Sequence, residues 1–177
     1  MKFVFGAIVA VFLSTQVNAQ NLDDGFSPLK LFVSTENIEG LQSVELEELW
    51  FAQEESEWMT TAYATFDVGN FKMNEFFGLA IDRAEVVIME PDENGNGTIW
   101  QFTLLIEDPG ANAYNAFMDD IESAYGPIFT YSIHEDDTES PNWFSEETLL
   151  TVSGSKHRIE HNGKKYIMVQ FMSGVGG

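Results

Sequence analysis

The alternation of apolar and polar residues along the chain predicts mainly β-strands. Residues 58–68 are rich in β-branched and aromatic side chains, which fit the pleated surface of a sheet. Residues 91–97 are rich in turn formers and separate two further strand-like runs. The expected strands, in chain order, are residues 31–33, 48–53, 58–68, 77–81, 84–89, 98–106, 128–133, 143–153 and 157–170.

The strongest local signal is Asn162-Gly163, which lies between two strand-like runs. This dipeptide predicts a two-residue type I′ hairpin turn, in which both residues need a positive φ. A turn of this type also sets the register of the two strands. We therefore expect Glu160 to lie opposite Lys165.

One helix is predicted, from about residue 109 to residue 125. Asp108 can cap its first turn and Pro109 suits the first helical position, whereas Gly126 ends it. The sequence therefore predicts an α+β fold, an antiparallel sheet of about six to eight strands with this helix packed on one face. The apolar residues of the helix recur three and four positions apart, as Ala113, Tyr114, Phe117, Met118, Ile121 and Ala124.

Residues 1–19 have the pattern of a cleavable secretory signal peptide. Lys2 precedes an apolar run from Phe3 to Leu13, and Ala19 supplies the small residue of a signal-peptidase site. This run is shorter than the about 20 residues that cross a bilayer, so no membrane anchor is expected. The remaining chain is expected to comprise a flexible lead-in over 20–30, a single α+β domain over 31–172 and a mobile tail over 173–177.

The chain is strongly acidic and lacks cysteine. Its 29 acidic and 8 basic residues give a net charge of −21, which repels phosphate groups, so nucleic acid is not an expected partner. A hydrophobic content of 44% supplies enough material for a core, so the acid content does not indicate disorder. An exported chain without disulfides indicates a bacterial protein of the periplasm or the extracellular space.

The most specific candidate site is formed by Asp92, Asn94 and Asn96, whose oxygen side chains match the opening of a calcium loop. The match then ends, because position 12 of such a loop is Thr103 where a glutamate would close the site. A remote acid such as Glu90 or Asp108 would have to complete the calcium shell. The alternative is a hairpin turn without a metal, since all these residues are also good turn formers.

Three weaker signals each have two interpretations. His157 and His161 share a strand face but lie roughly 13 Å apart at 3.3 Å per residue, which disfavours a zinc site. The aromatic residues between positions 50 and 77 form either core or a groove for a peptide or saccharide. A basic cluster near the final hairpin forms either a partner surface or the protection of a sheet edge, and it consists of Lys156, Arg158, Lys164 and Lys165.

The sequence contains no nucleophile elbow, phosphate-binding glycine loop or H-E-x-x-H helix. The leading hypothesis is therefore an exported, non-enzymatic binding or interaction domain that takes a protein or small ligand of unknown identity. The alternatives are a secreted hydrolase that uses acidic side chains and a calcium-stabilised structural module centred on Asp92. A binding domain should expose a connected apolar patch, whereas a hydrolase should bring two acids together in a pocket.

Overall fold

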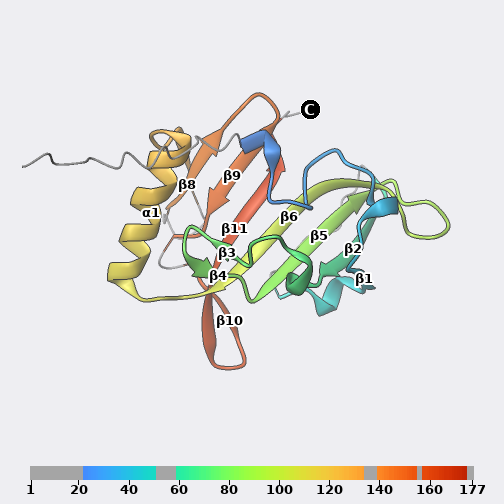
Figure 1. Cartoon of the computed structure of the whole chain (residues 1–177), viewed down its shortest axis with the longest axis horizontal. Coiled ribbons are helices and arrows are strands. Elements are labelled where there is room, and N and C mark those ends of the chain that lie inside the picture. The colour runs from blue at the N-terminus through green and yellow to red at the C-terminus, as the bar shows by residue number, and fades with distance from the viewer. Residues whose placement is uncertain (1–21, 51–58, 134–138, 155–156, 175–177) are drawn as a thin grey trace, which may run out of the picture.

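The computed structural model describes residues 22–50, 59–133, 139–154 and 157–174, and over these residues it shows one large sheet and one α-helix (Figure 1). The sheet has nine strands in the order β1-β2-β5-β6-β11-β9-β8-β7, with β10 paired to β11. All of its pairings are antiparallel. Its strands are β1 Leu41–Val44, β2 Thr61–Phe66, β5 Arg83–Met89, β6 Thr98–Glu107, β7 Thr130–Ile133, β8 Glu139–Phe144, β9 Thr148–Val152, β10 Ile159–His161 and β11 Lys164–Ser173.

The predicted α+β class with an antiparallel sheet is confirmed. The sheet has more strands than predicted partly because residues 143–153 belong to two strands, β8 and β9. Ser145 makes the tight turn between them, where its N–H donates to the carbonyl of Thr148 at 2.9 Å.

Two strand predictions near the N-terminus are wrong. Residues 31–33 form no strand, although Ser34 makes an isolated bridge to Thr98 of β6. Of the predicted strand 48–53, the described part forms the end of the 3₁₀ helix η3 (Leu46–Glu48) and a bend. Strand β1 was missed, because the apolar residues of this region follow neither a period of 2 nor one of 3.6.

Helix α1 spans Ala111–Tyr125, so it begins two residues later than predicted. The residue before it is Gly110, and no side chain caps its first turn. The predicted cap, Asp108, instead accepts the N–H of Gly110 at 2.9 Å and pairs with Arg158 Nε at 3.1 Å. These two contacts hold the carboxylate outside the helix.

The predicted apolar stripe of α1 faces the sheet. Phe117, Ile121 and Ala124 are buried, and Tyr114 and Met118 are half-buried against the core, whereas Ala113 is exposed. The helix ends where predicted, at Gly126, which adopts φ +88° and donates its N–H to the carbonyl of Glu122 at 2.9 Å.

The same face of the sheet is also covered by a small hairpin, β3 Glu75–Phe76 with β4 Leu79–Ala80, which crosses in front of the long strands (Figure 1). Phe26 and Leu29 are buried in this core. The segment expected as a flexible lead-in therefore contributes packed side chains. Phe76 reaches the centre of the core, where its ring lies 6.0 Å from that of Phe171 in β11.

The opposite face of the sheet carries a continuous row of polar side chains, one from each of eight neighbouring strands. Strand pairing places these residues directly beside one another, and alternation turns them away from the apolar core. Several are buried although they are polar, including Glu85 and Thr103. From β1 to β7 this polar row comprises Gln42, Thr65, Glu85, Thr103, Gln170, Thr151, Asn142 and Thr130.

The predicted hairpin at Asn162-Gly163 is confirmed. Both residues have positive φ, +52° and +76°, as a type I′ turn requires. Glu160 lies opposite Lys165, which is the predicted register.

Some predictions concern residues outside the described ranges. These are the signal peptide over residues 1–19 and the end of the tail, together with Phe51 and Trp58 of the aromatic region and Lys156 of the basic cluster. Within the described residues, the helices are too short or too polar to cross a bilayer.

Candidate functional site

Strand β7 lies at one end of the sheet order and pairs, among the described residues, only with β8. Its apolar side chains are unusually exposed: Phe129, just before the strand, is 70% exposed, Tyr131 48% and Ile133 74%. Residues two apart on a strand point to the same side, so Tyr131 and Ile133 form an apolar pair on β7, and Phe129 lies just before them. No described strand pairs with the second side of β7.

Natural sheets usually protect such an edge with lysine, proline or a very short strand, because unpaired backbone groups recruit other chains. β7 carries neither lysine nor proline. At the same end of the sheet, Phe144 of β8 is 43% exposed and its ring lies 5.7 Å from that of Phe129, although alternation places Phe144 on the face of Asn142 and Tyr131 on the other face. We call Phe129, Tyr131, Ile133 and Phe144 the β7 apolar edge.

The charged groups around the β7 apolar edge are acidic. Glu139 lies directly opposite Ile133 in the pairing of β8 with β7 and is exposed. Glu146 and Glu147 are exposed in the turn that follows Phe144. This surface therefore combines apolar side chains with negative charge.

A second candidate lies at the other end of the sheet, on the face that carries the polar row. There β1, β2, β5 and η3 surround an open hollow of about 580 Å³. In contrast to the β7 apolar edge, its lining is mostly polar or charged. We call this the Arg83 hollow, and its lining includes Gln42, Glu47, Glu48, Trp50, Arg83 and His161.

The guanidinium of Arg83 is held in place on three sides. Its Nε donates to Glu85 Oε1 at 2.6 Å, and its Nη2 donates to the carbonyl of Glu48 at 3.0 Å. The group also lies 4.8 Å from the ring centroid of Trp50, a cation–π distance. On that indole, His161 stacks with centroids 3.8 Å apart and ring planes 12° apart.

Glu85, which orients Arg83, is only 1% exposed. Its Oε1 also accepts the N–H of Trp50 at 2.9 Å, whereas its Oε2 has no hydrogen-bond partner among the described residues. The hydroxyl of Thr103, its neighbour in the polar row, is likewise buried without a partner there. Unpartnered buried polar atoms are rare in folded proteins, which makes this region a candidate site.

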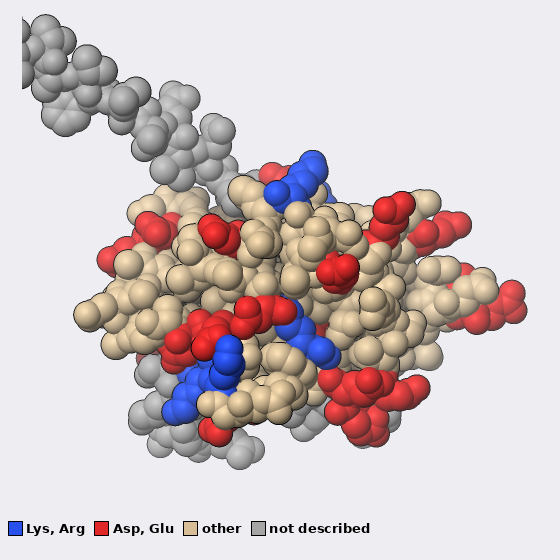
Figure 2. All heavy atoms as spheres, turned by 60° about the horizontal axis from the view of Figure 1, so that its bottom comes forward, with Lys and Arg blue, Asp and Glu red and all other residues tan. Residues whose placement is uncertain are grey.

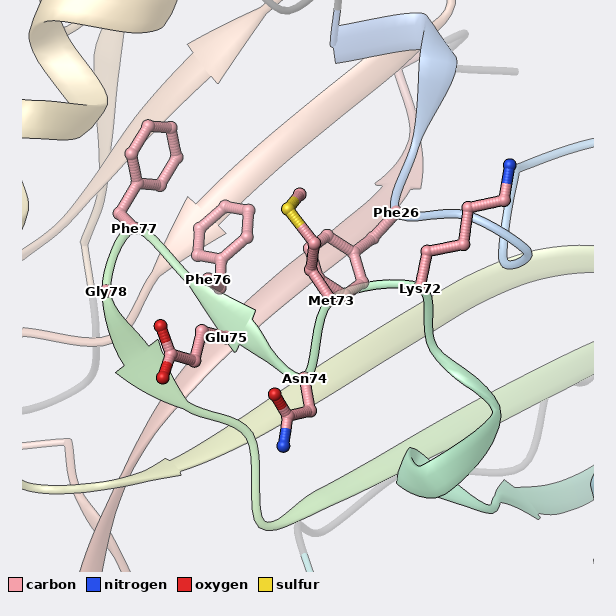
Figure 3. A pocket seen from close by; sticks show the side chains of 8 residues that line it. All are labelled: Phe26, Lys72, Met73, Asn74, Glu75, Phe76, Phe77 and Gly78. Carbon is pink, nitrogen blue, oxygen red and sulfur yellow. The ribbon is translucent and has the colours of Figure 1, made fainter.

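A third hollow, of about 560 Å³, lies at the β3–β4 hairpin (Figure 3). The rings of Phe76 and Phe77 point away from the polar ends of Asn74 and Glu75 there. Phe77 adopts φ +47°, which is costly for a residue with a Cβ. Its ring packs edge-on against Phe76, Phe117 and Tyr125, and these contacts offset the strain.

The predicted calcium residues lie in the exposed loop between β5 and β6. Asp92 Oδ1 accepts the backbone N–H groups of Asn94 at 2.8 Å and Asn96 at 2.9 Å. These bonds, the Asn96 bond first, lower the pKa of the Asp92 carboxyl. Asp108 cannot complete a shell, because the ten-residue β6 separates it from the loop by roughly 33 Å at 3.3 Å per residue.

No cluster of three or more metal-binding side chains occurs within the described residues. Calcium binding by Asp92, Asn94 and Asn96 stays a prediction. A melting temperature that rises with millimolar calcium, relative to chelator, would support it.

Two members of the basic cluster near the final hairpin, Arg158 and Lys164, pair with acidic side chains. Arg158 pairs with Asp108, and its guanidinium packs against α1, 4.3 Å from the ring centroid of Tyr114. Lys164 Nζ lies 2.5 Å from Glu107 Oε2, and this bond raises the lysine pKa. In Figure 2, basic groups occur in a few separate places and acidic groups are more widely spread.

Sequence reasoning found the strand that became β7 but not its position at an edge. It also missed Arg83 and Glu85, because a single Arg-x-Glu in a strand is not distinctive. Their only sequence signal is a charged pair inside an otherwise apolar run, 83–89. Comparisons of the chain with protein-family models, with curated proteins and with solved structures found no match.

Proposed function

We propose that this chain is an exported, non-enzymatic binding domain that takes up an extended segment of a partner protein at the β7 apolar edge. The observation that carries the proposal is the exposure of Tyr131 and Ile133 in alternation on β7 and of Phe129 just before it, where β7 pairs with only one strand among the described residues. In β-augmentation, backbone hydrogen bonds along such an edge supply affinity, and alternate side chains supply specificity.

The charges favour a basic partner over a second copy of this chain. Glu139, Glu146 and Glu147 surround the edge, and each copy carries a net charge of −21, so two copies repel each other. An extended segment with alternating apolar and basic residues would meet both features of the surface. Its apolar side chains would cover Phe129, Tyr131 and Ile133, and its cations would face the glutamates.

A selection of extended peptides from a random display library tests this proposal. We expect the selected peptides to alternate apolar with basic residues and to shift the amide NMR signals of residues 129–133. Ile133→Lys should weaken their binding by about tenfold or more, because it places a charge at the contact centre.

The control is Met73→Lys, which also replaces an exposed apolar side chain with a lysine. Met73 lies in the third hollow and is far from β7 in the chain. This variant should bind the peptides within about twofold of the parent chain, because an exposed residue outside an interface contributes little. Peptides that shift amides elsewhere, or that bind the Ile133→Lys variant equally well, would refute the proposal.

A further inference from the structure

Beside the Arg83 hollow, the buried carboxyl group of Glu85 contacts Arg83 through one oxygen and leaves the other oxygen without a hydrogen-bond partner among the described residues. Glu85 lies in the middle of the sheet at 1% exposure, where an ionised carboxylate loses its hydration. Among the described residues it pairs with Arg83, whose side chain remains 23% exposed. The buried group therefore orients a cation that still reaches solvent.

Arg83 has hydrogen-bond donors that its contacts with Glu85 and Glu48 do not use. A guanidinium carries five N–H groups, and the contacts with Glu85 and Glu48 use one on Nε and one on Nη2. Nη1 makes no hydrogen bond with the described residues. The remaining donors lie in one plane, the arrangement that matches a carboxylate.

The same hollow also contains negative groups. Glu47 and Glu48 line it together with Arg83, and Glu47 is exposed. Glu48 is partly engaged, since its Oε1 accepts the N–H of Glu45 at 3.1 Å. A ligand in this hollow thus meets a planar cation and at least one carboxylate.

We propose that the Arg83 hollow binds a small zwitterion, with the chemistry of a short peptide that has free termini. The ligand carboxylate lies against the free donors of Arg83, and the ligand ammonium lies against Glu47. This site is separate from the β7 apolar edge, since the two occupy opposite ends of the sheet order. It therefore does not depend on the proposed function of β7.

Two other ligand classes fit the hollow less well. A saccharide would need a free aromatic face for stacking, but His161 covers one face of Trp50 at 3.8 Å and the Arg83 guanidinium lies over the indole at 4.8 Å. A multiply charged anion is disfavoured by the net charge of −21 and by Glu47 and Glu48 in the lining.

NMR titration of the ¹⁵N-labelled protein with dialanine tests the proposal. Dialanine should shift the amides of Gln42, Thr65 and Arg83, which line the hollow. N-acetyl-dialanine lacks the ammonium and dialanine amide lacks the carboxylate, and each should bind about tenfold more weakly or worse. Sucrose, a neutral disaccharide, should leave these signals unchanged.

Variants of the two charged contacts complete the test. Arg83→Gln should abolish dialanine binding, whereas Lys72→Gln, which removes an equal charge at the third hollow, should leave it unchanged. If Arg83→Gln fails to fold, Glu47→Gln replaces it, because this exposed residue should weaken dialanine binding without affecting the fold. Equal binding of the acetylated or amidated dipeptide, a response to sucrose alone, or no amide shift with dialanine would overturn the proposal.

Discussion

At the β7 end of the sheet, three apolar side chains, Phe129, Tyr131 and Ile133, are exposed to solvent. Near the β1 end, by contrast, the carboxylate of Glu85 is buried beside Arg83. Both arrangements cost stability, the first through exposed apolar surface and the second through lost hydration. Yet the two regions share one sheet and one core. A common scaffold can therefore carry two different departures from ordinary packing, and such departures are expected at functional sites.

A substitution in the shared core should disturb both ends. Phe171→Ala should lower the free energy of unfolding by about 3–5 kcal/mol, because it removes a buried ring that stacks on Phe102 at 4.5 Å. Urea unfolding, followed by NMR signals from both ends, measures the loss. Phe129→Ala is the matched control and should change stability by less than about 0.5 kcal/mol. Unfolding of only one end would show that the two regions are independent.

A milder change distinguishes the buried acid from exposed ones. Glu85→Gln should lower the free energy of unfolding by about 1–3 kcal/mol, since it removes the charge that accepts hydrogen bonds from Arg83 and from the N–H of Trp50. The same exchange at the exposed Glu139, beside β7, should have almost no effect. Chemical denaturation of both variants provides the measurement. Equal losses would contradict the structural difference between the two ends.

A smaller effect on stability is expected at the β7 apolar edge itself. Ile133→Lys should change the free energy of unfolding by no more than about 0.5 kcal/mol, because the side chain is 74% exposed. Thermal and urea unfolding measure this effect. A loss above about 1 kcal/mol would show that Ile133 packs within the fold and is not available to bind a partner.

The smallest effect concerns the exposed loop at Asp92. Its folded pKa is lowered by backbone hydrogen bonds, so the stabilisation is present above the unfolded pKa, about 3.9, and is lost as the pH falls through the folded value. The melting temperature of the parent chain should therefore fall more steeply below about pH 4 than that of Asp92→Asn. Scanning fluorimetry from pH 6 to pH 3 checks this, and parallel curves would contradict it.

Local signals allowed several elements to be predicted. Asn162-Gly163 has only a few suitable backbone conformations, so its turn and register follow from two residues. Helix α1 was predicted from its apolar spacing and Gly126, although Asp108 was drawn away from its cap by Arg158, a partner 50 residues along the chain. Its start was therefore a tertiary effect.

The two candidate sites depended on contacts that no local pattern contains. The alternation of Phe129, Tyr131 and Ile133 predicts a strand, but an inner strand and an edge strand have the same alternation. Arg83 and Glu85 gained their geometry from Trp50 and Glu48, which come from a segment without clear periodicity. The Asp92 loop was found because its signal is local, and calcium binding by this loop stays a prediction.

The alternation of residues, the tight turns and the helix end followed from neighbours within a few positions, and the charge of the molecule followed from its composition. The tertiary structure alone decided the order of the strands. That order placed eight polar residues in one row, left β7 open and brought Trp50 onto Arg83. Such contacts join residues far apart in the chain, and their free energy arises only when the whole sheet is assembled.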